Sequence, residues 1–248
     1  MKRVYFCFLM GVLLKPIFAG SPLPSDSLKK VDLIFKNESA CFILKEKSSK
    51  KPEIFFGRSE CSKVFPLGNR DLLPLAIVAT DSGLIQDEKT LFKWDGIRYP
   101  NKLWNKDQFV TDWLQNQVTW VTDRLRLQLG ASSIEKQFRN FHLEENASAE
   151  AFMLFAESFF LETLTITKSI QNLSKRFFYI GRYRYGSEVW GQKAFGENFA
   201  SFTGHLKIKN QVWTFTTLLK PSPQSKEPLT AERAQALSMD VLTELGLF

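Results

Sequence analysis

The sequence predicts an α/β fold of the α+β type, in which an antiparallel sheet is built from both ends of the chain and covered by helices. Three observations support it. Residues 41–58 form two apolar runs around a polar turn, which is typical of a hairpin. Residues 176–221 alternate aromatic and β-branched residues as strands do, and residues 69–175 read mainly as helices and loops. We therefore expect one composite domain, with the helical lobe at the edge of the sheet.

The first residues predict an export signal. Lys2 and Arg3 precede an apolar stretch that ends at Leu14, and small residues follow up to Ala19. An uncleaved anchor is the alternative, but the apolar run is shorter than the roughly 20 residues that span a bilayer. We expect residues 1–19 to be a signal peptide, residues 20–248 to be the domain, no membrane span after signal removal, and a periplasmic or secreted location.

The charge and the cysteines restrict the classes of function. The formal charge of +7 falls to +4 when the three basic residues of segment 1–19 are removed, which is too modest to predict nucleic-acid binding. Cys41 and Cys61 lie ten positions on either side of Lys51, so a symmetric hairpin places them on opposing strands. In an oxidising compartment that arrangement predicts a disulfide. The two cysteines and the distant His142 and His205 make no plausible metal site, and we predict no cofactor.

The elements follow in order. An amphipathic stretch over residues 28–37 leads into the hairpin, and the N-terminal part of the sheet is expected within about 31–58. The run FPLGNRDLLP, residues 65–74, places Asn69 as the N-cap of the buried helix LLPLAIVA, with Pro74 just past its first turn. Residues 107–128 read as one continuous amphipathic helix.

The C-terminal part predicts the rest of the sheet and its cover. Lys209 and Asn210 form a tight turn between the last two strands of 176–221. A polar loop then precedes an amphipathic helix over 229–246, whose apolar side carries Leu237, Val241, Leu242 and Leu245.

Residues 79–108 resemble the oxacillinase-type class D β-lactamases. The motifs Asp81-Ser82-Gly83, Phe92-Lys93-Trp94-Asp95-Gly96 and Trp104-Asn105-Lys106-Asp107-Gln108 occur in that family's order, together with Tyr99-Pro100. The first hairpin strand, Phe202-Thr203-Gly204 and the C-terminal TELGLF extend the resemblance over most of the chain. It implies the serine β-lactamase/transpeptidase-like fold.

The resemblance also implies where the family's chemistry would be. A serine nucleophile and a carboxylated lysine form its S-x-x-K motif, an S-x-V serine relays protons, and a K-T-G strand holds the substrate carboxylate. Aligned without gaps, the nucleophile position is Asn69 and the base position is Leu72. The S-x-V serine position is Gln117, and the K-T-G lysine position is Gln192, with Lys193 displaced by one residue. A one-residue offset on a strand turns the Lys193 side chain to the other face.

Less specific correspondences complete the comparison. A Y-G-N-like loop appears as Leu143-Glu144-Glu145, and Phe159 takes the place of the tryptophan that shields the modified lysine. The segment between Gln171 and Gly191 is shorter than in the family, so we expect a helix beside the site to be missing.

These losses predict a pseudoenzyme with no intact catalytic residue. Loss of the nucleophile alone costs a serine hydrolase roughly a million-fold in kcat. The candidate ligand-binding residues are Arg70, Asp71, Gln117, Gln192 and Lys193. They would contact a cell-wall peptide, a β-lactam or a protein partner in the cleft. Two alternatives remain open: a scaffold with a filled cleft, or a repurposed hydrolase that uses a residue outside the family pattern, such as Asp71.

Overall fold

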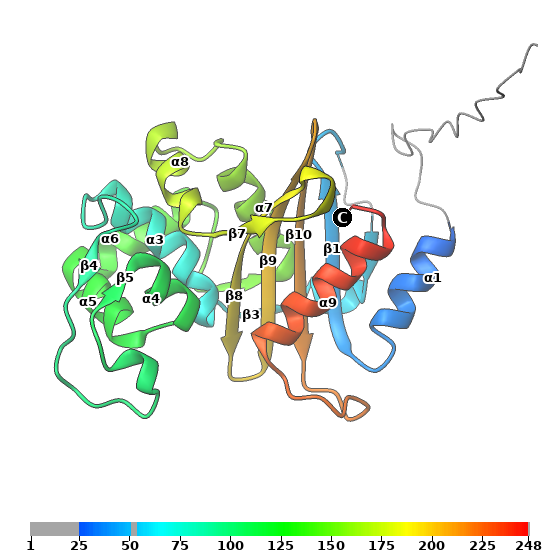
Figure 1. Ribbon diagram of the computed structural model, residues 1–248, viewed down its shortest axis with the longest axis horizontal. Coiled ribbons are helices and arrows are strands. Elements are labelled where there is room, and N and C mark those ends of the chain that lie inside the picture. The colour runs from blue at the N-terminus through cyan, green and yellow to red at the C-terminus, as the bar shows by residue number, and fades with distance from the viewer. Residues whose placement is uncertain (1–24, 51–53, 248) are drawn as a thin grey trace, which may run out of the picture.

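The computed structural model describes residues 25–50 and 54–247 (Figure 1). The predicted signal sequence, residues 1–19, lies outside this part of the chain. Within the described residues, no helix has both the length and the apolar character that a membrane span requires.

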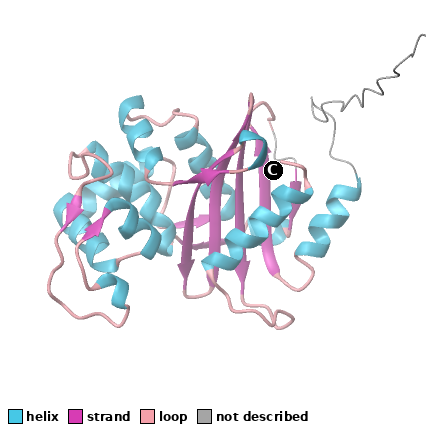
Figure 2. Ribbon diagram, viewed as in Figure 1, coloured by secondary structure: helices cyan, strands magenta, loops and turns pink. Residues whose placement is uncertain are grey.

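A six-stranded antiparallel sheet forms the centre of the molecule, in the order β2-β1-β10-β9-β8-β7 (Figure 2). The first strand of the N-terminal hairpin pairs with the last strand of the sheet along its whole length, from Ser39 opposite Lys220 to Glu46 opposite Trp213. The predicted joining of the two chain ends in one sheet is therefore confirmed. The strands of the sheet are β1 (Ser39–Glu46), β2 (Ile54–Phe56), β7 (Tyr179–Arg182), β8 (Glu188–Gly196), β9 (Phe199–Ile208) and β10 (Gln211–Lys220).

Helices cover both faces of this sheet and form a lobe at its β8 side (Figure 1). Helices α1 and α9 lie together on one face, and α7 packs on the other against β1, β9 and β10. The helices are α1 (Ser25–Ile34), α2 (Arg58–Cys61), α3 (Leu72–Asp81), α4 (Val110–Asn116), α5 (Thr119–Leu129), α6 (Ala131–Asn140), α7 (Ala149–Phe160), α8 (Lys168–Arg176) and α9 (Ala231–Glu244). The single-turn 3₁₀ helices are η1 (Gly68–Asp71), η2 (Lys102–Trp104) and η3 (Arg184–Gly186). Two short two-stranded sheets lie outside the central one, and they pair β3 (Val64–Pro66) with β6 (Asn146–Ser148) and β4 (Leu91–Phe92) with β5 (Gln108–Phe109).

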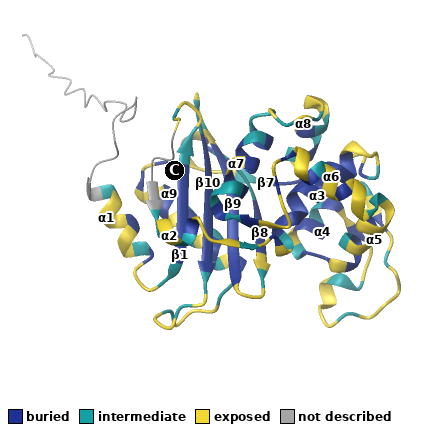
Figure 3. Cartoon of the chain, turned by 180° about the vertical axis from the view of Figure 1, so that it is seen from behind, coloured by how far each residue is buried: buried dark blue, intermediate teal, exposed yellow. Residues whose placement is uncertain are grey.

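The strands are buried because the sheet is covered on both faces (Figure 3). On β1, Phe42 and Leu44 join the core beneath α9, while Cys41 and Ile43 pack toward α7. On α9, the predicted apolar side is confirmed by the buried Val241, Leu242 and Leu245, with Leu237 partly buried beside them. The helical lobe has a separate core around α3, in which every residue from Leu72 to Thr80 is buried.

The hairpin at the N-terminal end differs from the symmetric one expected about Lys51. Phe42 lies opposite Phe56, so the register places the centre of the hairpin before Lys51. The second strand ends at Phe56 because Gly57 turns the chain with φ +63, and a Cβ there would lie 1.8 Å from the carbonyl oxygen of Ala40. Cys61 therefore lies on α2 rather than on a strand opposite Cys41. The predicted disulfide is nevertheless present, with both sulfur-bearing residues buried.

Removing this disulfide is expected to destabilise the fold. It closes a loop of 20 residues, and the loss of such a cross-link costs about 3 kcal/mol in the chain-entropy description. The double variant Cys41→Ala/Cys61→Ala should therefore show a midpoint of urea unfolding that is lower than in the oxidised protein. Adding reductant should shift the parent protein in the same direction and leave the variant unchanged. Equal midpoints for parent and variant under oxidising conditions would contradict the prediction.

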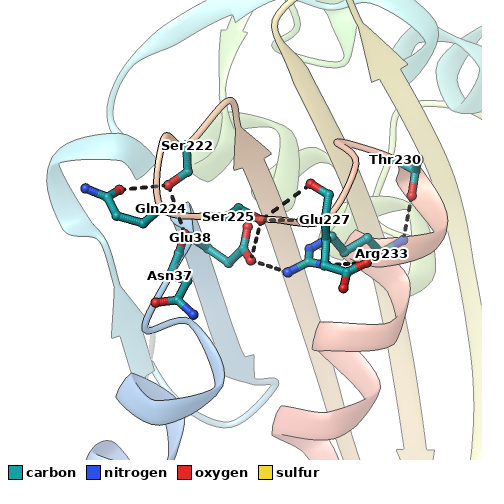
Figure 4. Close-up of polar contacts among 8 residues, drawn as sticks. All are labelled: Asn37, Glu38, Ser222, Gln224, Ser225, Glu227, Thr230 and Arg233. Carbon is teal, nitrogen blue, oxygen red and sulfur yellow. Dashed lines mark hydrogen bonds and ion pairs between the residues drawn. The ribbon is translucent and has the colours of Figure 1, made fainter.

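The loop between β10 and α9 is fastened to the turn between α1 and β1 (Figure 4). Glu38 accepts hydrogen bonds from Ser225 and from the guanidinium of Arg233, and Ser222 donates to the carbonyl of Asn37 at 2.8 Å. Thr230 begins α9 as its N-cap, accepting from the Arg233 amide at 3.1 Å. This network fixes α9 over the sheet, on the face opposite α7.

The predicted helix over residues 107–128 is wrong in one respect, because the structure divides it into α4 and α5. Gln117 adopts the left-handed conformation, with φ 51 and ψ 51, and ends α4. Val118 is extended and precedes α5. A left-handed non-glycine residue costs roughly 1–2 kcal/mol, so the break needs compensation from contacts of Gln117 elsewhere.

Candidate functional site

The site predicted from the sequence lies where η1, the α4–α5 junction and β8 meet. Residues Gly68–Asp71 form the single 3₁₀ turn η1, and α3 follows directly at Leu72. Asn69 is not the N-cap of α3, contrary to the sequence prediction. The residue before the helix is Asp71, and the Asn69 side chain points across the cleft instead of back to the helix amides.

Three side-chain amides close this cleft, and together we call Asn69, Gln117 and Gln192 the amide bridge. Asn69 Nδ2 donates to Gln117 Oε1 at 2.7 Å, and Gln117 Nε2 donates to the carbonyl oxygen of Lys193 at 3.2 Å. Gln192 Nε2 donates to the carbonyl oxygen of Asn69 at 2.8 Å. Gln117 and Gln192 are both buried. The hydrogen bonds therefore join the helical lobe to β8, and they compensate the left-handed backbone at Gln117.

The register on β8 separates Gln192 from Lys193. Gln192 faces η1, whereas Lys193 reaches the opposite face and pairs with Glu232 on α9 at 2.9 Å. This hydrogen bond from Lys193 is the main cause of a lowered pKa at Glu232. The side chain of Lys193 thus lies outside the cleft, as a one-residue offset on a strand requires.

Two further positions of the predicted site belong to the core of the lobe. Leu72 is 1% exposed and Phe159 is fully buried, and both lie in the apolar cluster around α3. Neither side chain carries a group that accepts or donates a proton.

Arg70 is buried beneath the site rather than presented to it. Its guanidinium donates to the carbonyl oxygens of Phe65, Pro66 and Ala147 at 3.0–3.2 Å. It also lies 5.4 Å from the centre of the Phe152 ring. Burial lowers the pKa of Arg70 to about 10, so the side chain stays charged at neutral pH. Its hydrogen-bonding capacity is directed at the backbone, and the residue is 1% exposed.

Asp71 is paired as well. Its carboxylate accepts from Arg126 on α5, which is half exposed, whereas Asp71 is 5% exposed. The carboxylate also lies at the start of α3, where the helix dipole stabilises a negative charge. Arg126 was not singled out in the sequence, since nothing local to residue 126 reveals a partner 55 residues earlier.

An open groove of about 1020 Å³ lies beside the amide bridge, on the side of α5 and α6. Its apolar lining includes the buried side chains of Leu67, Ile134, Phe138 and Leu143. Its polar lining includes the carboxylates Asp123, Glu135, Glu144 and Glu145 and the guanidinium groups of Arg126 and Arg139. Asn69 and Asp71 border it, whereas Gln117, Gln192 and Lys193 do not.

The groove was not predicted as a site. Glu144 and Glu145 were placed only as an altered loop, and Asp123, Glu135 and Arg139 look like ordinary exposed helix residues. What brings these segments together is the packing of α5 against α6 and the hydrogen bond from the Leu67 amide to the Glu145 carbonyl at 2.9 Å.

The chemistry of this arrangement follows from the side chains that are present. A carboxamide is not a nucleophile at neutral pH, and the amide nitrogens of the bridge already donate to Gln117 Oε1 or to backbone carbonyl oxygens. Among the described residues, no group of three or more His, Cys, Asp or Glu side chains is arranged to hold a metal ion.

Comparison with known proteins supports the resemblance seen in the sequence. The profile of the family described as "Penicillin binding protein transpeptidase domain" matches residues 73–158. The chain is 23% identical to Beta-lactamase OXA-1 of Escherichia coli over 56% of this chain and 51% of that protein. It is 22% identical to the Regulatory protein BlaR1 of Staphylococcus aureus over 97% of this chain and 43% of that protein. The chain thus spans about half or less of the length of these curated relatives.

Solved structures share the fold. The class D β-lactamase from Bacillus subtilis superposes with a TM-score of 0.79 at 17% identity, covering 88% of this chain and 96% of that one. The class D β-lactamase YbXI from Nostoc gives a TM-score of 0.77 at 16% identity, covering 88% of this chain and 99% of that one. The sequence matches and the shared fold together support a class D β-lactamase-like family for this chain, and its fold is that of the class D β-lactamases.

Proposed function

We propose that this protein is an exported, non-catalytic member of the class D β-lactamase-like group, which binds a ligand or a protein partner in the cell envelope without hydrolysing a lactam. The amide bridge carries the proposal. Where the family places a nucleophile, a proton relay and a carboxylate clamp, this chain has three amides that hydrogen-bond across the cleft.

The surroundings of the bridge support the proposal. A general base at position 72 would need an amine or carboxylate, but Leu72 is part of the lobe core. Lys193 is turned to Glu232 and is not directed at the cleft. Asp71 is the remaining candidate for a repurposed hydrolase, and its pairing with Arg126 stabilises the ionised carboxylate without leaving an unpaired base.

The names of the relatives also support a non-catalytic role. Their names include regulatory proteins as well as β-lactamases, and the alignment to Regulatory protein BlaR1 of Staphylococcus aureus extends over 97% of this chain. The Methicillin resistance mecR1 protein of the same species aligns over 89% of it. We infer that this chain acts by binding, as a regulatory or scaffold protein does.

Exposure to a fluorescent penicillin tests the loss of chemistry. We expect no covalent adduct by intact mass and in-gel fluorescence, and no hydrolysis of a chromogenic cephalosporin above the buffer rate. Loss of a serine nucleophile alone removes about a million-fold in kcat, so turnover should be undetectable. An active class D enzyme treated in parallel shows that the reagents work. An adduct on the parent protein that a single substitution abolishes would overturn the proposal.

A further inference from the structure

The groove beside the amide bridge carries four carboxylates that the fold does not use. Asp123 on α5, Glu135 on α6, and Glu144 and Glu145 in the following loop are all exposed and line the groove. In the part of the chain that the structure describes, none of these side chains forms a hydrogen bond or an ion pair. They differ in this from Asp71, which is neutralised by Arg126.

The local charge is opposite to that of the whole chain. With Asp71 and Arg126 neutralising each other, four carboxylates face one remaining guanidinium, that of Arg139, so the groove carries a net charge of −3. The complete chain carries +7. Such a local field attracts cations and repels anionic ligands, and it acts over roughly 8–10 Å at physiological salt.

The size and the lining of the groove indicate which kind of cationic ligand it could bind. The described acidic side chains do not converge on one point as metal ligands do, which argues against a single divalent ion. The volume of about 1020 Å³ is at the upper limit of small-molecule pockets, which hold roughly 300–1,000 Å³. The lining also includes buried apolar side chains, those of Leu67, Ile134, Phe138 and Leu143, below the charged rim.

We propose that this groove binds a basic peptide segment of a partner protein. Lysine and arginine suit it because their aliphatic stems cover apolar surface while their charged ends reach a carboxylate rim. An extended segment with several such residues matches charges that are distributed over α5, α6 and the 143–145 loop. The proposal rests on the non-catalytic role proposed above. The ligand of this groove is cationic, whereas the group that a K-T-G strand holds in the family is an anionic carboxylate.

Fluorescence anisotropy with a labelled (Lys-Ala)₃ peptide tests the proposal on the full chain. We expect saturable binding that weakens as salt rises, and no binding of the matched (Glu-Ala)₃ peptide. In the variant Glu135→Gln/Glu145→Gln, the Kd for the lysine peptide should rise about tenfold, since each exposed ion pair contributes up to about fivefold. Both substitutions are exposed and nearly isosteric, so the unfolding temperature should be unchanged.

The matched control removes the same charge elsewhere. Asp32 on α1 and Asp240 on α9 are exposed and lie with their helices on the far face of the sheet. Asp32→Asn/Asp240→Asn should leave the Kd within about twofold of the parent. Equal losses in the two double variants, or equal affinity for the glutamate peptide, would overturn the proposal. So would self-association of the chain that only the groove variant abolishes, because a second copy would then be the occupant.

The same samples keep the two proposals apart. A penicillin adduct contradicts the non-catalytic role whatever the peptide does. Absence of both adduct and peptide binding overturns only the assignment of the groove.

Discussion

Replacing Arg70 with methionine is expected to lower the free energy of unfolding by about 3–5 kcal/mol, because it removes several hydrogen bonds that a buried, charged donor makes to the backbone. The guanidinium supplies hydrogen bonds to the carbonyl oxygens of Phe65, Pro66 and Ala147. Methionine fills much of the same volume but donates to none of them. A hydrogen bond from a charged donor contributes roughly 1.5–3 kcal/mol, and the loss of three such bonds exceeds what the relief of burying a charge returns.

The position of Arg70 makes this effect relevant to the site. Its three carbonyl partners belong to β3 and β6, so the Arg70 side chain links η1, where Asn69 also lies, to the β3–β6 pair. Arg70→Lys should recover only part of the loss, since one ammonium does not reproduce a planar fork of donors. Chemical denaturation followed by circular dichroism measures both variants.

Arg139→Met supplies the control for this experiment. Arg139 is exposed on α6 and lines the groove, and its removal should change stability by no more than about 0.5 kcal/mol. If Arg70→Met unfolded within 1 kcal/mol of the parent protein, the structural role assigned to the buried guanidinium would be wrong.

Arg70 also illustrates what the sequence does not determine. An arginine in a polar run at a helix start reads as exposed, because few arginines are fully buried. Its burial depends on Phe152 and Phe199, which are remote in the sequence and close over the guanidinium only in the folded chain. The break at Gln117 has the same origin. The apolar periodicity of residues 107–128 is continuous, and the bonds that hold the break come from Asn69 and Lys193.

Other features could be predicted because they depend on local chemistry. Alternation of aromatic and β-branched residues identified the strands at both ends of the chain, and a two-residue turn at Lys209 and Asn210 joins β9 to β10 as expected. The side of β8 that carries Lys193 followed from the strict two-residue period of a strand. The family resemblance had already pointed to the three residues of the amide bridge as site positions. The groove could not be predicted, because tertiary packing alone brings its lining residues together.

The stability of the protein is expected to fall as pH drops below 6.5, because of His205. This residue is 7% exposed, stacked on Phe160 with ring centres 4.8 Å apart, and its Nδ1 lies 3.3 Å from the Thr214 hydroxyl. Burial is the main cause that lowers the pKa of His205 from 6.5 to about 3, and the charges of Lys175, Lys207 and Lys47 act in the same direction.

The direction of the effect follows from the two pKa values. Above pH 6.5 the imidazole is neutral in both the folded and the unfolded chain, so His205 does not affect the pH dependence there. Between pH 6.5 and 3 the unfolded chain binds a proton that the folded chain excludes, and stability is lost at up to about 1.4 kcal/mol per pH unit. The loss between pH 6.5 and 5, above the range in which ordinary carboxylates titrate, should be about 1.7 kcal/mol.

Urea unfolding at closely spaced pH values measures this slope, and the only other histidine of the sequence supplies the control. His205→Gln removes the titrating group, so its free energy of unfolding should be nearly constant between pH 6.5 and 5. His142 is exposed, and His142→Gln should keep the slope of the parent protein. Because the readout is a slope, a general destabilisation by either substitution does not imitate the result. A parent protein whose stability is flat over this interval would show that His205 is free to take up a proton in the folded state. Proton uptake in the folded state would then require the stacked rings of His205 on β9 and Phe160 on α7 to separate.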